Sequence, residues 1–66
     1  MIHEGFEFKI KPDLTVKGSR FYCVMQNPFT DEHDTRVLFG GSIGIVERKI
    51  IKQFEKFRKE KESVDR

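Results

Sequence analysis

The chain has 66 residues, a formal net charge of +2 and seven phenylalanines. A chain of this length forms a single domain, residues 1–66, and buries only about 60% of the surface that it exposes when unfolded. Its composition excludes a membrane-spanning stretch of roughly 20 apolar residues, and Cys23, the only cysteine, excludes an internal disulfide. The first residues lack the basic segment and apolar run of an export signal, so we expect a cytoplasmic protein.

Alternation with a period of two indicates two strands in the first half of the chain. Apolar residues occupy the even positions of residues 6–16, and charged or polar residues occupy the odd positions. A two-residue turn at Lys17 and Gly18 puts most of the larger apolar side chains of both strands on one face. The pattern therefore predicts a hairpin with strands at about residues 5–16 and 19–26.

The register of this hairpin depends on which residues make the turn. The two-residue turn sets Pro12 opposite Cys23 and places Leu14 on the core face. Because Pro12 has no N–H to donate, it belongs on an edge strand, at a bulge or in a break. An alternative turn at residues 12–15 would shift this register and shorten both strands.

A polar loop and a short third strand follow the hairpin. Asn27 and Pro28 break the alternation, and residues 30–35 form an exposed loop that is rich in acidic side chains. Residues 36–39 predict the third strand, which can pair with either the first or the second strand. The sheet is therefore expected to be antiparallel and three-stranded, with its strand order open.

Residues 42–61 predict one amphipathic helix. The chain enters it through the turn of Gly40 and Gly41, and Ser42 is the expected N-cap. Residues 63–66 are expected to fray. The resulting fold is α+β, in the order β-β-β-α, with the helix packed on one face of the sheet. The apolar residues of the helix fall within an arc of roughly 140°, and they are Ile43, Val46, Ile50, Ile51, Phe54 and Phe57.

The outer side of the predicted helix is basic. Residues 1–35 carry a net charge of −2 and residues 36–66 a net charge of +4. Five cations gather within an arc of about 100°, a spacing that suits contact with a phosphate backbone, although a solvated surface would look the same. We call these five residues the basic helix surface: Arg48, Lys49, Lys52, Lys56 and Lys59.

Two further surfaces are weaker candidates. In the predicted register Lys9, Lys11 and Tyr22 share the outer face of the sheet, and single-stranded nucleic acid uses this mixture of basic and aromatic groups. The turn at residues 40–42 offers free N–H groups at a helix start, where an anion can bind. It lacks the Gly-Lys-Ser/Thr ending of a phosphate-binding loop, so a purely structural turn is the stronger interpretation.

No pattern in the sequence indicates catalysis. Acidic residues and a histidine crowd residues 31–34, but their spacing matches no recognised zinc or calcium site. Cys23 is expected in the core, where a thiol behaves as a small apolar group. We therefore expect no enzyme, no cofactor and no metal.

These patterns predict a small binding or regulatory protein. Its most concrete function is that of a nucleic-acid-binding accessory domain that uses the basic helix surface. The alternative is a protein–protein adaptor or inhibitor that has no contact with nucleic acid and is able to form a homodimer. Such a module would dock its sheet edge or exposed apolar residues such as Ile45 and Phe29 onto a larger protein.

Overall fold

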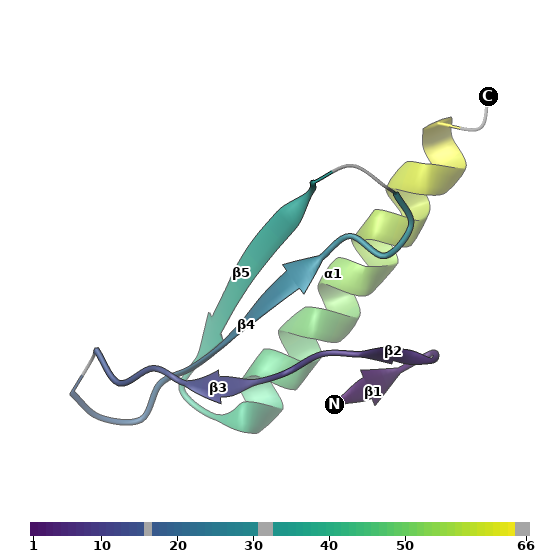
Figure 1. Ribbon diagram of the computed structural model, residues 1–66. Helices are drawn as coiled ribbons and strands as arrows, with labels where there is room; N and C mark the ends of the chain where they lie inside the picture. Colours follow the sequence, from purple (N-terminus) through teal and green to yellow (C-terminus); the bar gives the residue numbers. More distant parts are fainter. Residues whose placement is uncertain (16, 31–32, 65–66) are drawn as a thin grey trace.

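The computed structural model describes residues 1–15, 17–30 and 33–64. Strands β3, β4 and β5 form an antiparallel sheet in that spatial order, β1 and β2 form a separate hairpin, and α1 lies along one face of the sheet (Figure 1). The predicted α+β class is confirmed. The elements are β1 (Ile2–His3), β2 (Phe6–Glu7), β3 (Lys11–Pro12), β4 (Phe21–Gln26), β5 (Thr35–Gly40) and α1 (Ile43–Val64).

The third strand of the prediction pairs with the second. Strand β5 runs antiparallel to β4 over its whole length, from Phe21 opposite Gly40 to Gln26 opposite Thr35. This pairing makes β4 the central strand. It leaves β3 and β5 as the two edges of the sheet.

The first predicted strand is wrong, because residues 5–16 hold two short strands, β2 and β3, instead of one continuous strand, and β1 precedes them. The chain begins with a tight hairpin whose two turn residues, Glu4 (φ 48°) and Gly5 (φ 85°), both have positive φ angles. A two-residue turn of this type matches the twist of the strands that it joins. Backbone bonds extend the hairpin, since the Met1 amino group donates to the Phe8 carbonyl (2.9 Å) and the Phe8 N–H donates to the Met1 carbonyl (2.7 Å).

The register between β3 and β4 is two residues from the predicted one. Pro12 lies opposite Phe21, not Cys23, and Lys11 lies opposite Tyr22. A shift of two residues keeps every side chain on its own face, so Cys23 still points into the core. Pro12 occupies an edge strand, as its missing N–H requires.

The register differs because the chain turns earlier than Lys17. The Asp13 carboxylate accepts hydrogen bonds from the Thr15 N–H (3.0 Å) and hydroxyl (2.6 Å), which bends the backbone directly after β3. The Asp13 N–H also donates to the Arg20 carbonyl (2.8 Å). Leu14, predicted to face the core, is therefore 90% exposed. Val16, at the end of the predicted strand, lies outside the described residues.

The core lies between α1 and the inner face of the sheet. Of the six apolar helix residues predicted to face it, Ile43 is 50% exposed and Ile51 is 39% exposed. Ile43 is the first residue of the helix, and Ile51 sits about 60° around the helix from Phe54, at the border of the buried side. The buried apolar residues are Phe8, Cys23, Met25, Val46, Ile50, Phe54 and Phe57.

Phe54 is the centre of an aromatic cluster. Its ring lies 4.8 Å from His3, 5.0 Å from Phe29, 5.8 Å from Phe6 and 6.2 Å from Phe8, measured between ring centroids. Three of these contacts are edge-to-face, the geometry that aromatic quadrupoles favour. The cluster joins the N-terminal hairpin and the loop after β4 to the helix, so Phe29, predicted to be exposed, is half-buried.

At the start of the helix, Gly40 packs closely against the side chains of Ile45 and Val46. A Cβ atom at Gly40 would lie 2.7 Å from Ile45 Cγ2 and 3.0 Å from Val46 Cγ2, so any other residue there requires the start of the helix to shift. The Ser42 hydroxyl accepts a hydrogen bond from the Ile45 N–H (3.3 Å), which confirms the predicted N-cap. Helix α1 continues to Val64, and residues 65–66 of the predicted frayed tail lie outside the described residues.

Replacing Gly40 tests the close packing between β5 and the start of the helix. We expect Gly40→Ala to lower the free energy of unfolding by about 1–3 kcal/mol, because the new methyl group must push the helix away from β5. Gly41→Ala is the matched control, since its Cβ would meet nothing nearer than the Ser19 carbonyl at 4.0 Å and its φ is not positive. Urea denaturation of both variants measures the difference, and equal stabilities would show that the packing at Gly40 is looser than described.

Replacing Phe54 tests the aromatic cluster. Phe54→Ala removes the ring that all four neighbours contact, and we expect it to cost about 3–5 kcal/mol and to unfold most of the domain. Lys56→Ala changes an exposed position on the same helix and should cost less than about 0.5 kcal/mol. An unchanged melting temperature of Phe54→Ala in circular dichroism would contradict the packing of α1 on the sheet.

Candidate nucleic-acid interface

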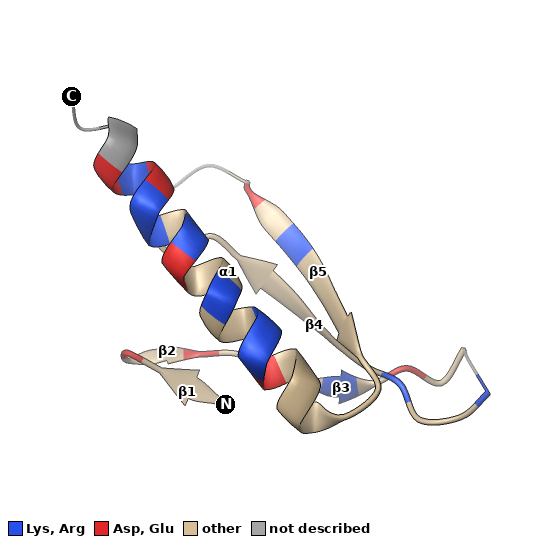
Figure 2. Cartoon of the chain, turned by 180° about the vertical axis from the view of Figure 1, so that it is seen from behind, with Lys and Arg blue, Asp and Glu red and all other residues tan. Residues whose placement is uncertain are grey.

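All five residues of the basic helix surface are exposed. They lie on successive turns of α1, so Lys and Arg recur along the helix (Figure 2). Within the described residues none of the five forms an ion pair with a carboxylate; the ion pairs of the helix belong to Arg58. The five cations are therefore not held in ion pairs within the described residues, although glutamates also occur along the helix.

Two contacts shape the borders of this surface. Lys49 donates a hydrogen bond through Nζ to the Phe39 carbonyl, which places its ammonium group beside β5. Glu55 lies 3.5 Å from Arg58 Nη1, and Arg58 also pairs with Glu4 of the N-terminal hairpin. The carboxylate of Glu55 is thus held on the side of the helix that faces the hairpin.

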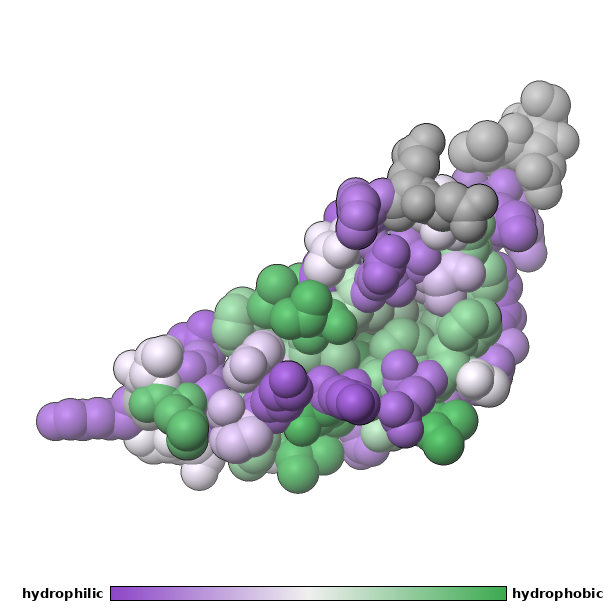
Figure 3. Space-filling view, viewed as in Figure 1, coloured by the Kyte–Doolittle hydropathy of each residue, from purple (hydrophilic) through white to green (hydrophobic). Residues whose placement is uncertain are grey.

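Among the described residues, α1 covers one face of the sheet and no helix covers the opposite face. We call Tyr22, Val24, Val37 and Phe39 the open sheet face. Val24 is 57% exposed, Val37 50% and Phe39 38%. Figure 3 shows that hydrophobic groups are exposed beside hydrophilic ones on this side of the molecule. The rings of Tyr22 and Phe39, cross-strand neighbours, lie 6.4 Å apart.

A groove of about 610 Å³ borders this face, between β4 and the chain that runs from β2 to β3. It brings together Lys9, Lys11 and Tyr22, the three residues of the predicted sheet site. Glu7 also lines it and adds a negative charge that opposes the binding of an anion. The groove is therefore partly cationic and partly apolar.

Arg20 and Phe39 are surface residues that the sequence did not reveal. The Arg20 guanidinium lies 4.2 Å from the centroid of the Phe39 ring, within the range of a cation–π contact. Pairing β5 with β4 is what brings Phe39 beside Tyr22. Alternation within residues 35–40 places Phe39 on one face of its strand. It indicates the neighbouring residues only when the partner strand is also known.

The turn before α1 has a structural role at two of its three residues. Side chains of Ile45 and Val46 fill the space over Gly40, and the Ser42 hydroxyl is bound to a helix N–H. The Ser19 carbonyl lies 4.0 Å from the position of a Cβ on Gly41. These contacts favour the structural interpretation of residues 40–42 over an anion site.

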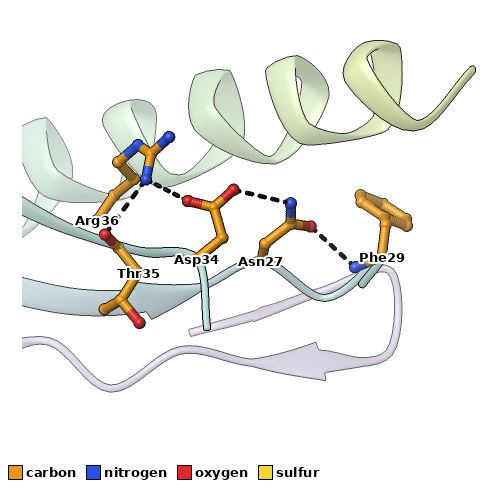
Figure 4. Close-up of polar contacts among 5 residues, drawn as sticks. All are labelled: Asn27, Phe29, Asp34, Thr35 and Arg36. Carbon is orange, nitrogen blue, oxygen red and sulfur yellow. Dashed lines mark hydrogen bonds and ion pairs between the residues drawn. The ribbon is translucent and has the colours of Figure 1, made fainter. Parts of the chain in front are cut away.

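The described part of the acidic loop also has a structural role. Asp34 accepts a hydrogen bond from the buried Asn27 amide (3.2 Å) and pairs with Arg36, while Asn27 accepts one from the Phe29 N–H (2.9 Å) (Figure 4). This network closes the chain between β4 and β5. His33 is exposed, and residues 31–32 lie outside the described residues.

A second polar cluster joins the N-terminal hairpin to the helix. Ligand atoms of His3, Glu4 and Glu55 lie within 4.8 Å of one another, an arrangement that the sequence did not indicate. Arg58 pairs with both carboxylates, and its hydrogen bond to Glu4 raises the pKa of the guanidinium. The cluster therefore already contains its own cation and acts as an anchor for the hairpin.

Cys23 is fully buried, and this burial raises the pKa of its thiol. The thiol therefore stays protonated near neutral pH and lacks the thiolate that nucleophilic attack requires. It contributes to the core as a small apolar group.

Comparison with protein families, curated proteins and solved structures finds no match for this chain. Across residues 1–15, 17–30 and 33–64, no helix combines the length and apolar character needed to cross a membrane. The surfaces described above are therefore the basis for assigning a function.

Proposed function

We propose that the chain is a small nucleic-acid-binding protein that contacts phosphate groups through the basic helix surface. The observation that carries this proposal is the set of five exposed cations without a carboxylate partner among the described residues. Lysine and arginine that replace counterions on phosphates supply most of the affinity of sequence-independent binding. A row of exposed cations that are not held in ion pairs is suited to that role.

The dimensions of the surface fit contact with several phosphates. From Arg48 to Lys59 the helix rises about 16 Å at 1.5 Å per residue, so the cations extend over three turns. Lys49 remains available despite its bond to Phe39, because an ammonium group carries three donors. Contacts of this kind position a nucleic acid without reading its sequence.

The open sheet face supports a second contact with single-stranded nucleic acid. Tyr22 and Phe39 offer adjacent aromatic rings for base stacking, and Lys11 and Arg20 lie beside them. This face is on the other side of the sheet from α1 (Figure 1). A short duplex bound to the helix would not reach it, so a preference for single strands would indicate that the sheet takes part.

A protein-binding module is the second candidate function. It is supported by the exposure of Val24 and Val37, which form a cross-strand apolar pair on the open sheet face. Ile45 adds an apolar side chain at the start of the helix that is 41% exposed, although part of it packs over Gly40. Apolar groups that remain together on a surface mark sites of association with other proteins.

The salt dependence of binding tests the nucleic-acid proposal. We expect the affinity for a fluorescent mixed-sequence duplex, measured by anisotropy, to fall steeply between low and physiological salt. Lys52→Ala and Lys56→Ala should each reduce the slope of log K against log salt by about 1, because each removes one phosphate contact. The matched control is Lys17→Ala, which removes the same charge from an exposed position in the loop between β3 and β4.

Two results would contradict the proposal. One is the absence of binding at low salt, which would leave the protein-binding module as the better candidate. The other is an equal loss of affinity and slope in Lys17→Ala, which would show that only the net charge matters and that the helix is not the contact surface.

A further inference from the structure

Strand β5 is an edge of the sheet, and the pattern of its hydrogen bonds shows which of its backbone groups do not bond to β4. Hydrogen-bonded and non-bonded pairs alternate along an antiparallel ladder. The Asn27 N–H donates to the Asp34 carbonyl (2.8 Å), so this pair is of the bonded kind. Because bonded pairs recur at every second residue, Arg36, Leu38 and Gly40 also form backbone hydrogen bonds with β4.

The residues between them direct their backbone groups away from β4. These are Thr35, Val37 and Phe39, whose N–H and C=O groups face the free edge. Two side-chain contacts agree with this assignment, since Lys49 donates to the Phe39 carbonyl and Arg36 donates to the Thr35 carbonyl (3.4 Å). Across the described residues, no strand pairs with this side of β5.

We infer that β5 pairs with β5 of a second copy of the chain. An antiparallel pairing with Val37 on the two-fold axis sets Val37 opposite Val37 of the second copy and Thr35 opposite Phe39. All of these residues direct their N–H and C=O groups to the edge, so each pair exchanges two hydrogen bonds. The edge is therefore complementary to itself, as a two-fold interface requires.

The side chains of β5 also complement one another in this register. Arg36 faces Leu38 of the second copy, so no two arginines lie opposite each other. Arg36 and Leu38 are on the helix side, because Arg36 lies 5.6 Å from the Phe57 ring and Leu38 packs against the core. Because side chains alternate along the strand, Asp34 is also on the helix side of the sheet. The pairing sets it opposite Gly40 of the second copy.

This position brings opposite charges together. The Lys49 ammonium group is held at the Phe39 carbonyl, one residue before Gly40, and it also comes from the helix side. Pairing of the two edges takes the Phe39 carbonyl into the new ladder and leaves Lys49 next to Asp34 of the second copy. The Lys49 ammonium group, which lies at the edge of β5 in the single chain, thus forms a contact with the second copy across the interface.

The dimer changes the surface available to a partner. A two-fold axis perpendicular to the sheet joins two three-stranded sheets into one of six strands and leaves both copies of α1 on the same face. The two basic helix surfaces then lie on one side of the molecule. This last consequence rests on the proposed function, whereas the pairing of the strands does not.

Sedimentation equilibrium of the full chain, without nucleic acid, tests the pairing. We expect the wild type to pass from monomer to dimer as its concentration rises. Val37→Pro removes an edge donor but no bond to β4 and should weaken the dimer at least about tenfold, whereas Val37→Thr keeps the N–H and should still dimerise. A wild type that stays monomeric at millimolar concentration, or a Val37→Pro dimer of unchanged affinity, would overturn the inference.

A charge swap keeps the test decisive if Val37→Pro does not fold. Val37 is exposed in the single chain, so Val37→Lys and Val37→Glu should both fold. On the two-fold axis each variant places like charges directly opposite each other and should remain monomeric. An equimolar mixture of the two should form a heterodimer, and failure of the mixture to associate while the wild type dimerises would place the interface elsewhere.

Discussion

The packing of rings around Phe54 is the contact on which the rest of the structure depends. A chain of this size has little apolar surface to bury, so a few large side chains must supply most of the stability. The ring of Phe54 contacts the N-terminal hairpin through His3 and Phe6, and the loop after β4 through Phe29. The ion pair between Arg58 and Glu4, one turn along the helix, supports the same contact.

This packing fixes which surfaces remain free. Because the helix turns Val46, Ile50, Phe54 and Phe57 toward the sheet, its cations point away from the core. Because one helix covers only one face of a three-stranded sheet, the other face keeps exposed apolar side chains. The candidate surfaces are therefore consequences of a small α+β fold, and their chemistry suits an anionic partner on the helix and stacking or association on the sheet.

Local patterns in the sequence predicted the parts of the fold that local chemistry controls. The hairpin pattern predicted a strand at residues 19–26, where β4 lies, and Ser42 marked the start of the helix. The N-terminal hairpin was missed because Glu4 stands at a position of positive φ where Asn or Asp would have signalled the turn. The register of β3 was missed because the hydrogen bonds of Asp13 to Thr15 place the turn before Lys17. The cations of the candidate site could be predicted from the sequence, whereas the contact of Arg20 with Phe39 depends on a strand pairing that no local pattern specifies.

An amide NMR titration of the labelled protein is the most direct test of the central claim, that the helix contacts phosphate groups. A short mixed-sequence duplex and one of its single strands would each be added at low and at physiological salt. The account predicts shifts that cluster at Arg48, Lys52, Lys56 and Lys59 and weaken as salt rises. Shifts confined to the open sheet face would move the contact to the sheet, and the absence of any shift at low salt would contradict nucleic-acid binding altogether.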